Sequence, residues 1–132
     1  MNRNPLYDPR EDSFLLAEAV KIHAYGKTLD MGTGAGILAI TAVIKKEVKS
    51  VLAVDINTNA IVQAKKNNSH PLITYMQSDL FSNIKDTFDT IIFNPPYLPN
   101  DSRILDIALD GGKKGYELSV RFLKDAKKHL NN

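Results

Sequence analysis

The sequence predicts an α/β fold in which parallel strands form one wound sheet. Its apolar residues gather in four short, nearly continuous runs of the kind that form buried strands, residues 28–31, 51–54, 73–76 and 90–93. The runs begin about every 20 residues, and helix-like stretches separate them. Because parallel neighbours need crossover connections, this alternation is typical of a parallel sheet covered by helices.

The two helices between the strands have recognisable starts. Residues 37–44 follow a glycine-rich turn. Residues 60–66 follow Asn57 and Thr58, whose side chains are typical helix caps. We therefore expect both helices to pack on the sheet.

Two further helices are predicted near the ends of the chain. Asp12 or Ser13 is expected to cap the first of them. Its expected apolar stripe consists of Phe14, Leu15, Ala19 and Ile22. The second is expected after Gly115, and its stripe consists of Leu118, Phe122, Ala126 and Leu130.

The composition limits the kinds of protein that the chain can be. Its 132 residues and 43% hydrophobic content suit a single domain over residues 1–132. No run reaches the roughly 20 apolar residues of a membrane helix, and a cytoplasmic protein is expected. With no cysteine and three scattered histidines, no metal site is predicted. The net charge of +2 gives weak support for a nucleic-acid partner.

Three glycines stand at alternate positions, Gly32, Gly34 and Gly36, between the first predicted strand and the next helix. Such a turn lets the backbone approach a ligand closely, as in loops that bind nucleoside cofactors. The dinucleotide fingerprint would need a glycine where Ile37 stands, so the spacing disfavours a pyrophosphate.

Polar side chains mark the carboxyl ends of the predicted strands, at Asp30, Asp55, Asp79 and Asn94. Ligands of open α/β sheets bind at these ends. Asp55 is placed to accept hydrogen bonds from ribose hydroxyls, and Asp79 from an adenine amino group. Each aspartate alone could be a cap or a turn former, but their common register with the glycine loop favours one shared crevice.

The fourth predicted strand leads into the candidate catalytic residues, Asn94, Pro95, Pro96 and Tyr97. Each proline lacks an N–H donor, which leaves carbonyl oxygens as the free polar groups. The Asn94 side-chain oxygen and the Pro95 carbonyl can hold the N–H groups of an amide or amine, and Tyr97 can stack on a planar group. Since methyl transfer from a sulfonium requires mainly positioning, the motif predicts methylation of a planar nitrogen. A merely rigid strand exit is the alternative.

Three segments, residues 7–14, 30–36 and 93–97, resemble the HemK-like protein-glutamine methyltransferases. The first of them resembles most the short archaeal and eukaryotic branch, which acts on class I translation release factors. The resemblance implies a class I methyltransferase (Rossmann-like) fold and S-adenosylmethionine as the cofactor. The segment 110–115 also resembles a glycine-rich segment of that branch, although a plain helix-entry turn explains it equally well.

The resemblance also implies a role for each candidate residue. Asp12 and Ser13 would close over the cofactor, and residues 30–36 would hold its methionine part. Residues 94–97 would bind the glutamine of a Gly-Gly-Gln loop. The candidate cofactor-binding residues are Asp12, Ser13, Asp30, Gly32, Gly34, Gly36, Asp55, Ile56, Asp79, Leu80 and Asn94.

The chain departs from that family in length, because the family fold has seven strands and four are predicted here. The wound sheet is thus expected to be truncated after the fourth strand and its following helix, with an exposed edge. A shortened form of a longer protein and a natural short form completed by a partner both fit. The branch pairs with a small zinc-ribbon activator protein, and such a partner is expected.

Two other functions are compatible with these motifs. The same clamp serves enzymes that methylate the exocyclic amine of adenine in DNA or RNA, which usually carry a strongly basic surface. The candidates for such a surface here are Lys45, Lys46, Lys49, Lys113 and Lys114, which could equally be a solvated face. A cofactor-binding or scaffold subunit without catalytic activity is the second alternative.

Overall fold

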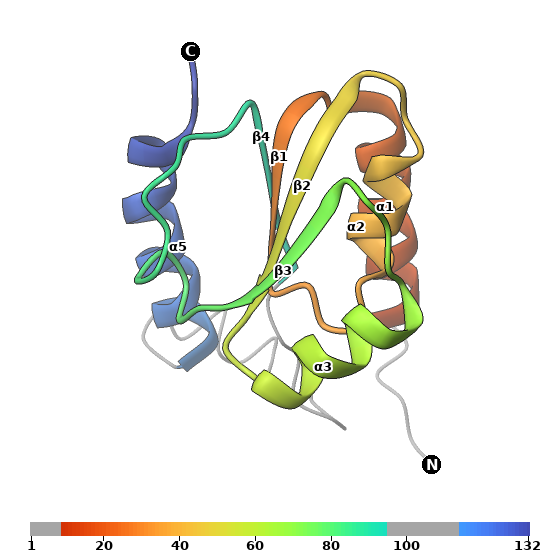
Figure 1. Ribbon diagram of the computed structural model, residues 1–132. Coiled ribbons are helices and arrows are strands. Elements are labelled where there is room, and N and C mark those ends of the chain that lie inside the picture. The colour runs from red at the N-terminus through yellow and green to blue at the C-terminus, as the bar shows by residue number, and fades with distance from the viewer. Residues whose placement is uncertain (1–8, 95–113) are drawn as a thin grey trace.

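The computed structural model describes residues 9–94 and 114–132, which form three layers with the sheet in the middle (Figure 1). Helices α1, α2 and α3 lie on one side of the sheet, and α5 lies on the other. The elements are α1 (Pro9–His23), β1 (Gly26–Met31), α2 (Ile37–Val43), β2 (Val48–Asp55), α3 (Thr58–Asn67), β3 (Ile73–Gln77), β4 (Thr90–Phe93) and α5 (Lys114–His129).

The sheet has the order β3-β2-β1-β4, and every neighbouring pair is parallel. The four predicted strands and their parallel arrangement are therefore confirmed. The register aligns Asp30 with Ala53 of β2 and Ile92 of β4, and Ala53 in turn with Tyr75 of β3. Since side chains in one register row point to the same face, Asp30 and Tyr75 face the side that α1, α2 and α3 cover.

Each face of the sheet has its own apolar core, because buried parallel strands are apolar on both sides. The core under α1 and α2 consists of Val20, Ala24, Leu38, Ala39, Ala42, Val43, Val48, Val51, Ala53, Ile73 and Ile92. The core under α5 consists of Leu29, Met31, Val54, Leu80, Phe81, Ile84, Phe88 and Phe122. In this second core the rings of Phe93 and Phe122 stack with their centroids 4.0 Å apart.

The predicted start and buried face of the first helix are wrong. The helix α1 begins at Pro9, a residue that suits the first turn of a helix, so Asp12 and Ser13 lie inside it and cannot be its cap. The predicted stripe faces outward, since Phe14, Leu15 and Ile22 are 62%, 59% and 71% exposed and Ala19 is exposed too. The buried face is formed by Leu16, Ala17 and Val20, and the buried Ala24 follows directly after the helix.

The described end of the chain runs beside the strand at the edge of the sheet. Leu130 forms a parallel bridge with Phe88, two residues before β4. The Phe88 N–H donates to the His129 carbonyl, and the Asn131 N–H donates to the Phe88 carbonyl, both at 2.7 Å. Phe122 and Ala126 pack on the core as predicted, but Leu130 lies beyond α5 and is half exposed. Within the described ranges, no helix is long and apolar enough to span a bilayer.

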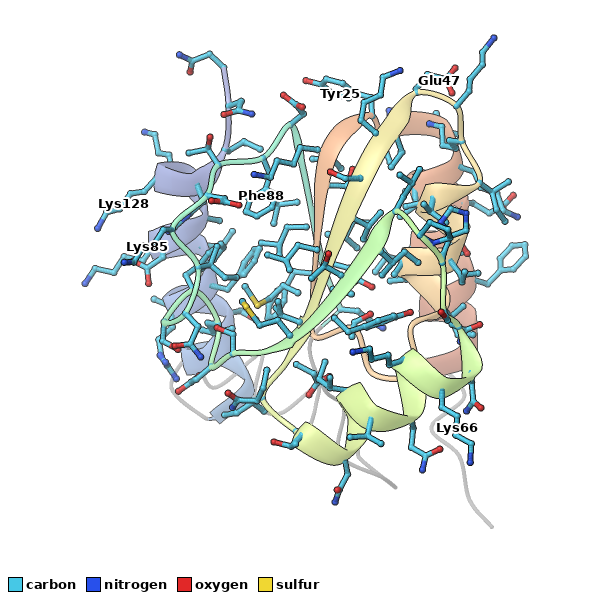
Figure 2. The ribbon with its side chains drawn as sticks, in the orientation of Figure 1. Tyr25, Glu47, Lys66, Lys85, Phe88 and Lys128 are labelled. Carbon is cyan, nitrogen blue, oxygen red and sulfur yellow. The ribbon has the colours of Figure 1, made fainter. Side chains whose placement is uncertain are left out.

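Phe88 links α5, the chain end and the sheet, so its loss should destabilise the fold. Its side chain is fully buried between the sheet and α5 (Figure 2). Phe88→Ala should therefore lower the free energy of unfolding by about 3–5 kcal/mol, as measured by urea denaturation. Phe14→Ala is the matched control, and a change of more than about 0.5 kcal/mol there would contradict the outward position of Phe14.

Candidate functional site

The glycine loop and the first residue of the predicted clamp touch at the carboxyl ends of β1 and β4. The Asn94 N–H donates to the Met31 carbonyl at 3.4 Å. A Cβ atom on Gly32, which has a φ of +76°, would lie 3.0 Å from the Asn94 carbonyl oxygen. Any side chain at residue 32 would therefore push these two segments apart, and glycine keeps them together.

The backbone of the glycine loop is anchored to the end of β2. The N–H groups of Gly32 and Thr33 donate to the Val54 carbonyl, at 2.9 and 2.8 Å. The Gly34 N–H donates to Asp55 Oδ2 at 2.9 Å. Gly34 also has a positive φ of +54°, and a Cβ atom there would meet no described residue within 4 Å. Gly34 is thus the loop glycine with open space beside it, where a ligand can approach.

Asp30 is a fully buried carboxylate next to the loop. Its Oδ2 accepts a hydrogen bond from Thr33 Oγ1 at 2.7 Å, whereas its Oδ1 has no hydrogen-bond partner among the described residues. Burial raises the pKa of Asp30 to about 6, and the negative charge of Asp55 adds to the rise, although the hydrogen bonds oppose it. A buried acceptor without a donor suits a ligand that brings an amino group.

Asp55 connects the glycine loop to the start of α3. While Oδ2 accepts from Gly34, its Oδ1 accepts from the Asn57 N–H at 2.9 Å. Asn57 in turn caps α3, because its Oδ1 accepts from the N–H groups of Asn59 and Ala60 at 2.9 and 3.3 Å. The predicted cap is confirmed, and each Asp55 oxygen keeps a lone pair that can accept from a ribose hydroxyl.

Three other candidate cofactor residues, Asp79, Ile56 and Leu80, differ in their exposure and in their contacts. Asp79 Oδ1 accepts from Arg121 Nη2 at 3.3 Å, an exposed ion pair that the sequence did not suggest because 42 residues separate its members. Ile56 is 61% exposed, and its carbonyl accepts from Gln77 Nε2 at 3.2 Å. The Leu80 side chain is buried in the core under α5, so only its backbone can face a ligand.

Several predicted residues lie wholly or partly outside the described part of the chain. Pro95, Pro96 and Tyr97 are among them, so the structure places the predicted clamp only at Asn94. Asp12 and Ser13 belong to α1, but their side chains are not described. Most of the segment 110–115 is outside as well, and its last two residues begin α5.

The parallel sheet, the glycine loop after β1 and the acidic residues beside it define a class I, Rossmann-like methyltransferase fold. A solved ribosomal protein L11 methylase from Lactobacillus delbrueckii subsp. bulgaricus has this fold, with a TM-score of 0.68 over 99% of this chain and 66% of that chain. Its sequence identity is 24%, so the likeness is one of fold.

Sequence comparison then identifies the family. The family model described as methyltransferase small domain matches residues 10–132, and the chain belongs to that family. A Methanocaldococcus jannaschii protein provisionally named protein N5-glutamine methyltransferase is 40% identical over an alignment of 132 positions, which covers 95% of this chain and 66% of that protein. The release factor glutamine methyltransferase of Lactococcus lactis is 32% identical over an alignment of 118 positions, which covers 80% of this chain and 44% of that protein. The chain thus spans less than two thirds of either relative.

Because the pKa of Asp30 is raised in the folded state, the free energy of unfolding should depend on pH. The folded state holds the Asp30 proton more tightly than the unfolded state, whose pKa is near 3.8. The Asp30 contribution to stability is therefore fully present below about pH 4 and is lost as the pH rises through 6. Relative to Asp30→Asn, the free energy of unfolding should fall by about 2–3 kcal/mol between pH 4 and 7.

Urea denaturation of both proteins across this pH range measures the effect. The difference between them isolates Asp30, because every other titrating group is common to both. A difference that does not change with pH would show that the carboxyl is not buried as described.

Proposed function

We propose that the chain binds S-adenosylmethionine and transfers its methyl group to the glutamine side-chain amide of a class I translation release factor. The contact between Gly32 and the Asn94 carbonyl carries this proposal, because it joins the cofactor loop to the first residue of the clamp. The relatives named as glutamine methyltransferases support the choice of acceptor.

The residues around the loop fit the parts of this cofactor. The Asp30 Oδ1 atom has no donor among the described residues, and the amino group of a methionine moiety would supply one. The open space at Gly34 leaves room for the same moiety, and the Asp55 carboxylate can accept from the ribose hydroxyls. The bound cofactor would supply an activated methyl group on a sulfonium.

The chain's own contribution to transfer is mainly to position the amide. An amide nitrogen is a weak nucleophile, so its N–H groups need to be held by acceptors while the nitrogen faces the methyl. We propose the Asn94 side-chain oxygen as one of these acceptors, with the Pro95 carbonyl and the Tyr97 ring completing the clamp. The β1–β4 pairing holds Asn94 beside the loop, so an amide bound by Asn94 would lie next to the bound cofactor.

Methylation of adenine is the alternative, and one observation weighs against it. Lys45, one of the candidates for a basic nucleic-acid surface, caps the carboxyl end of α1. Its Nζ donates to the Ala24 carbonyl at 2.7 Å, where a cation also interacts favourably with the helix dipole. Lys45 therefore has a structural role that requires no polyanion.

A small zinc-ribbon activator protein is the second partner that we propose. Within the described residues β4 lies at the edge of the sheet, and an edge strand offers unpaired backbone groups to a partner. This proposal concerns assembly and not the transfer step.

The test is a transfer assay with labelled S-adenosylmethionine, with and without the activator. The acceptors are a release factor with a Gly-Gly-Gln loop, the same factor with glutamine changed to alanine, and adenine-containing DNA and RNA. Label on the glutamine supports the proposal. Label on adenine would replace it with the alternative, and cofactor binding without transfer to any acceptor would favour a scaffold subunit.

Asn94→Ala separates binding from transfer. The variant loses a side-chain acceptor of the clamp but keeps the backbone bond to Met31, so the loop should stay in place. Transfer should fall by about 100-fold or more, while the Kd for S-adenosylmethionine by calorimetry should change less than about twofold. An equal loss of binding and transfer would contradict the role of Asn94 as a clamp residue.

A further inference from the structure

Two residues, Asn68 and Tyr75, lie against the glycine loop at Ala35 and Gly36. Asn68, which ends α3, donates from Nδ2 to the Ala35 carbonyl at 2.7 Å. Tyr75 of β3 donates from its hydroxyl to the Asn68 carbonyl, also at 2.7 Å. These bonds join three segments of the chain, since Ala35 lies between Gly34 and Gly36 of the loop.

Tyr75 also determines which residue can stand at position 36. A Cβ atom on Gly36 would lie 2.7 Å from the Tyr75 hydroxyl oxygen and 3.4 Å from the Ala64 Cβ atom. Gly36 also has a φ of +86°, which glycine adopts readily. The loop therefore needs its third glycine because Tyr75 and α3 lie directly against it.

The residues that hold the loop differ in whether they would also contact a ligand. The Asp55 carboxylate, which holds Gly34, is also the proposed ribose acceptor, so it would contact both the loop and a bound cofactor. The Asn68 amide and the Tyr75 hydroxyl contact the protein's own carbonyls instead. Burial, with the charge of Asp30 second, raises the pKa of Tyr75, so its hydroxyl keeps its proton and stays a donor.

We propose that Asn68 and Tyr75 are positioning residues, which fix the glycine loop in the conformation that accepts the methionine part of the cofactor. This inference rests on the proposed function, since it assumes that the loop holds that part. A loop fixed in advance loses less conformational entropy when a ligand binds, and affinity rises accordingly. Neither residue touches the reacting atoms, so the effect is on affinity for one part of the ligand.

The test compares two ligands that share adenine and ribose but differ in the methionine part. S-adenosylhomocysteine has that part, and 5′-methylthioadenosine lacks it. In Tyr75→Phe and in Asn68→Ala, the Kd for S-adenosylhomocysteine should rise about 3- to 10-fold, the effect of one lost hydrogen bond. The Kd for 5′-methylthioadenosine should change less than about twofold. Calorimetry on the full chain measures both.

Two matched controls are available in the same chain. Tyr25→Phe removes a hydroxyl from a half-exposed tyrosine, and Asn67→Ala removes an amide from the exposed neighbour of Asn68. Both should leave the two affinities unchanged. Thermal unfolding of every variant shows whether the fold is retained.

The outcomes separate this inference from the function on which it rests. If the unaltered chain binds both ligands and the Tyr75 and Asn68 variants bind S-adenosylhomocysteine equally well, the positioning role is wrong and the cofactor assignment stands. If the variants lose affinity for both ligands in parallel, the residues only support the fold, and the inference is again wrong. If the unaltered chain binds neither ligand, the cofactor assignment fails and the inference fails with it.

Discussion

The rest of the site depends on the close approach of Gly32 to the Asn94 carbonyl. Because β1 and β4 are parallel neighbours, the segments that leave their carboxyl ends start side by side. At a Cβ-to-oxygen separation of 3.0 Å, even a methyl group at residue 32 would force a shift in the backbone. Under the proposed function, the position of the methyl donor relative to its acceptor would thus depend on sheet pairing.

Asp30 shows that this arrangement has a cost in stability. The carboxyl is fully buried, one oxygen has no donor among the described residues, and its pKa is about 6. An unsatisfied buried acceptor costs about 1–3 kcal/mol. An apolar residue at this position would avoid that penalty, and the proposed contact with the cofactor would account for a carboxylate here. The two apolar cores, one on each face, supply the stability that makes it tolerable.

The strands and the loop could be predicted from the sequence because their signals are local. Each strand is a short apolar run between turn residues, and the Asn57 cap and the alternate glycines each lie within a few residues of what they shape. The first helix was mispredicted because its buried side depends on contacts with distant segments. An apolar stripe in the sequence does not reveal which side of a helix meets the core, and Phe14 and Leu15 point outward while the smaller Ala17 and Ala24 pack inward.

The residues that sequence reasoning missed act across long separations. Arg121 meets Asp79 across 42 residues, and Asn68 meets Ala35 across 33. Both Asn68 and Tyr75 have ordinary local explanations, as a helix end and a strand residue, so no pattern in the sequence marks them. Only the fold brings them to the loop, because β3 lies two strands from β1 and α3 returns the chain toward it.

The three glycines of the loop therefore have three separate causes. Gly32 is required by Asn94 and Gly36 by Tyr75, which are both parts of the protein, whereas a Cβ atom on Gly34 would meet no described residue. Packing within the protein thus explains Gly32 and Gly36, whereas the positive φ of Gly34 favours glycine there and the space beside it suits the proposed ligand. A loop whose shape is determined by its neighbours is already formed before any ligand binds, and a preformed loop would lower the entropy cost of binding the proposed cofactor.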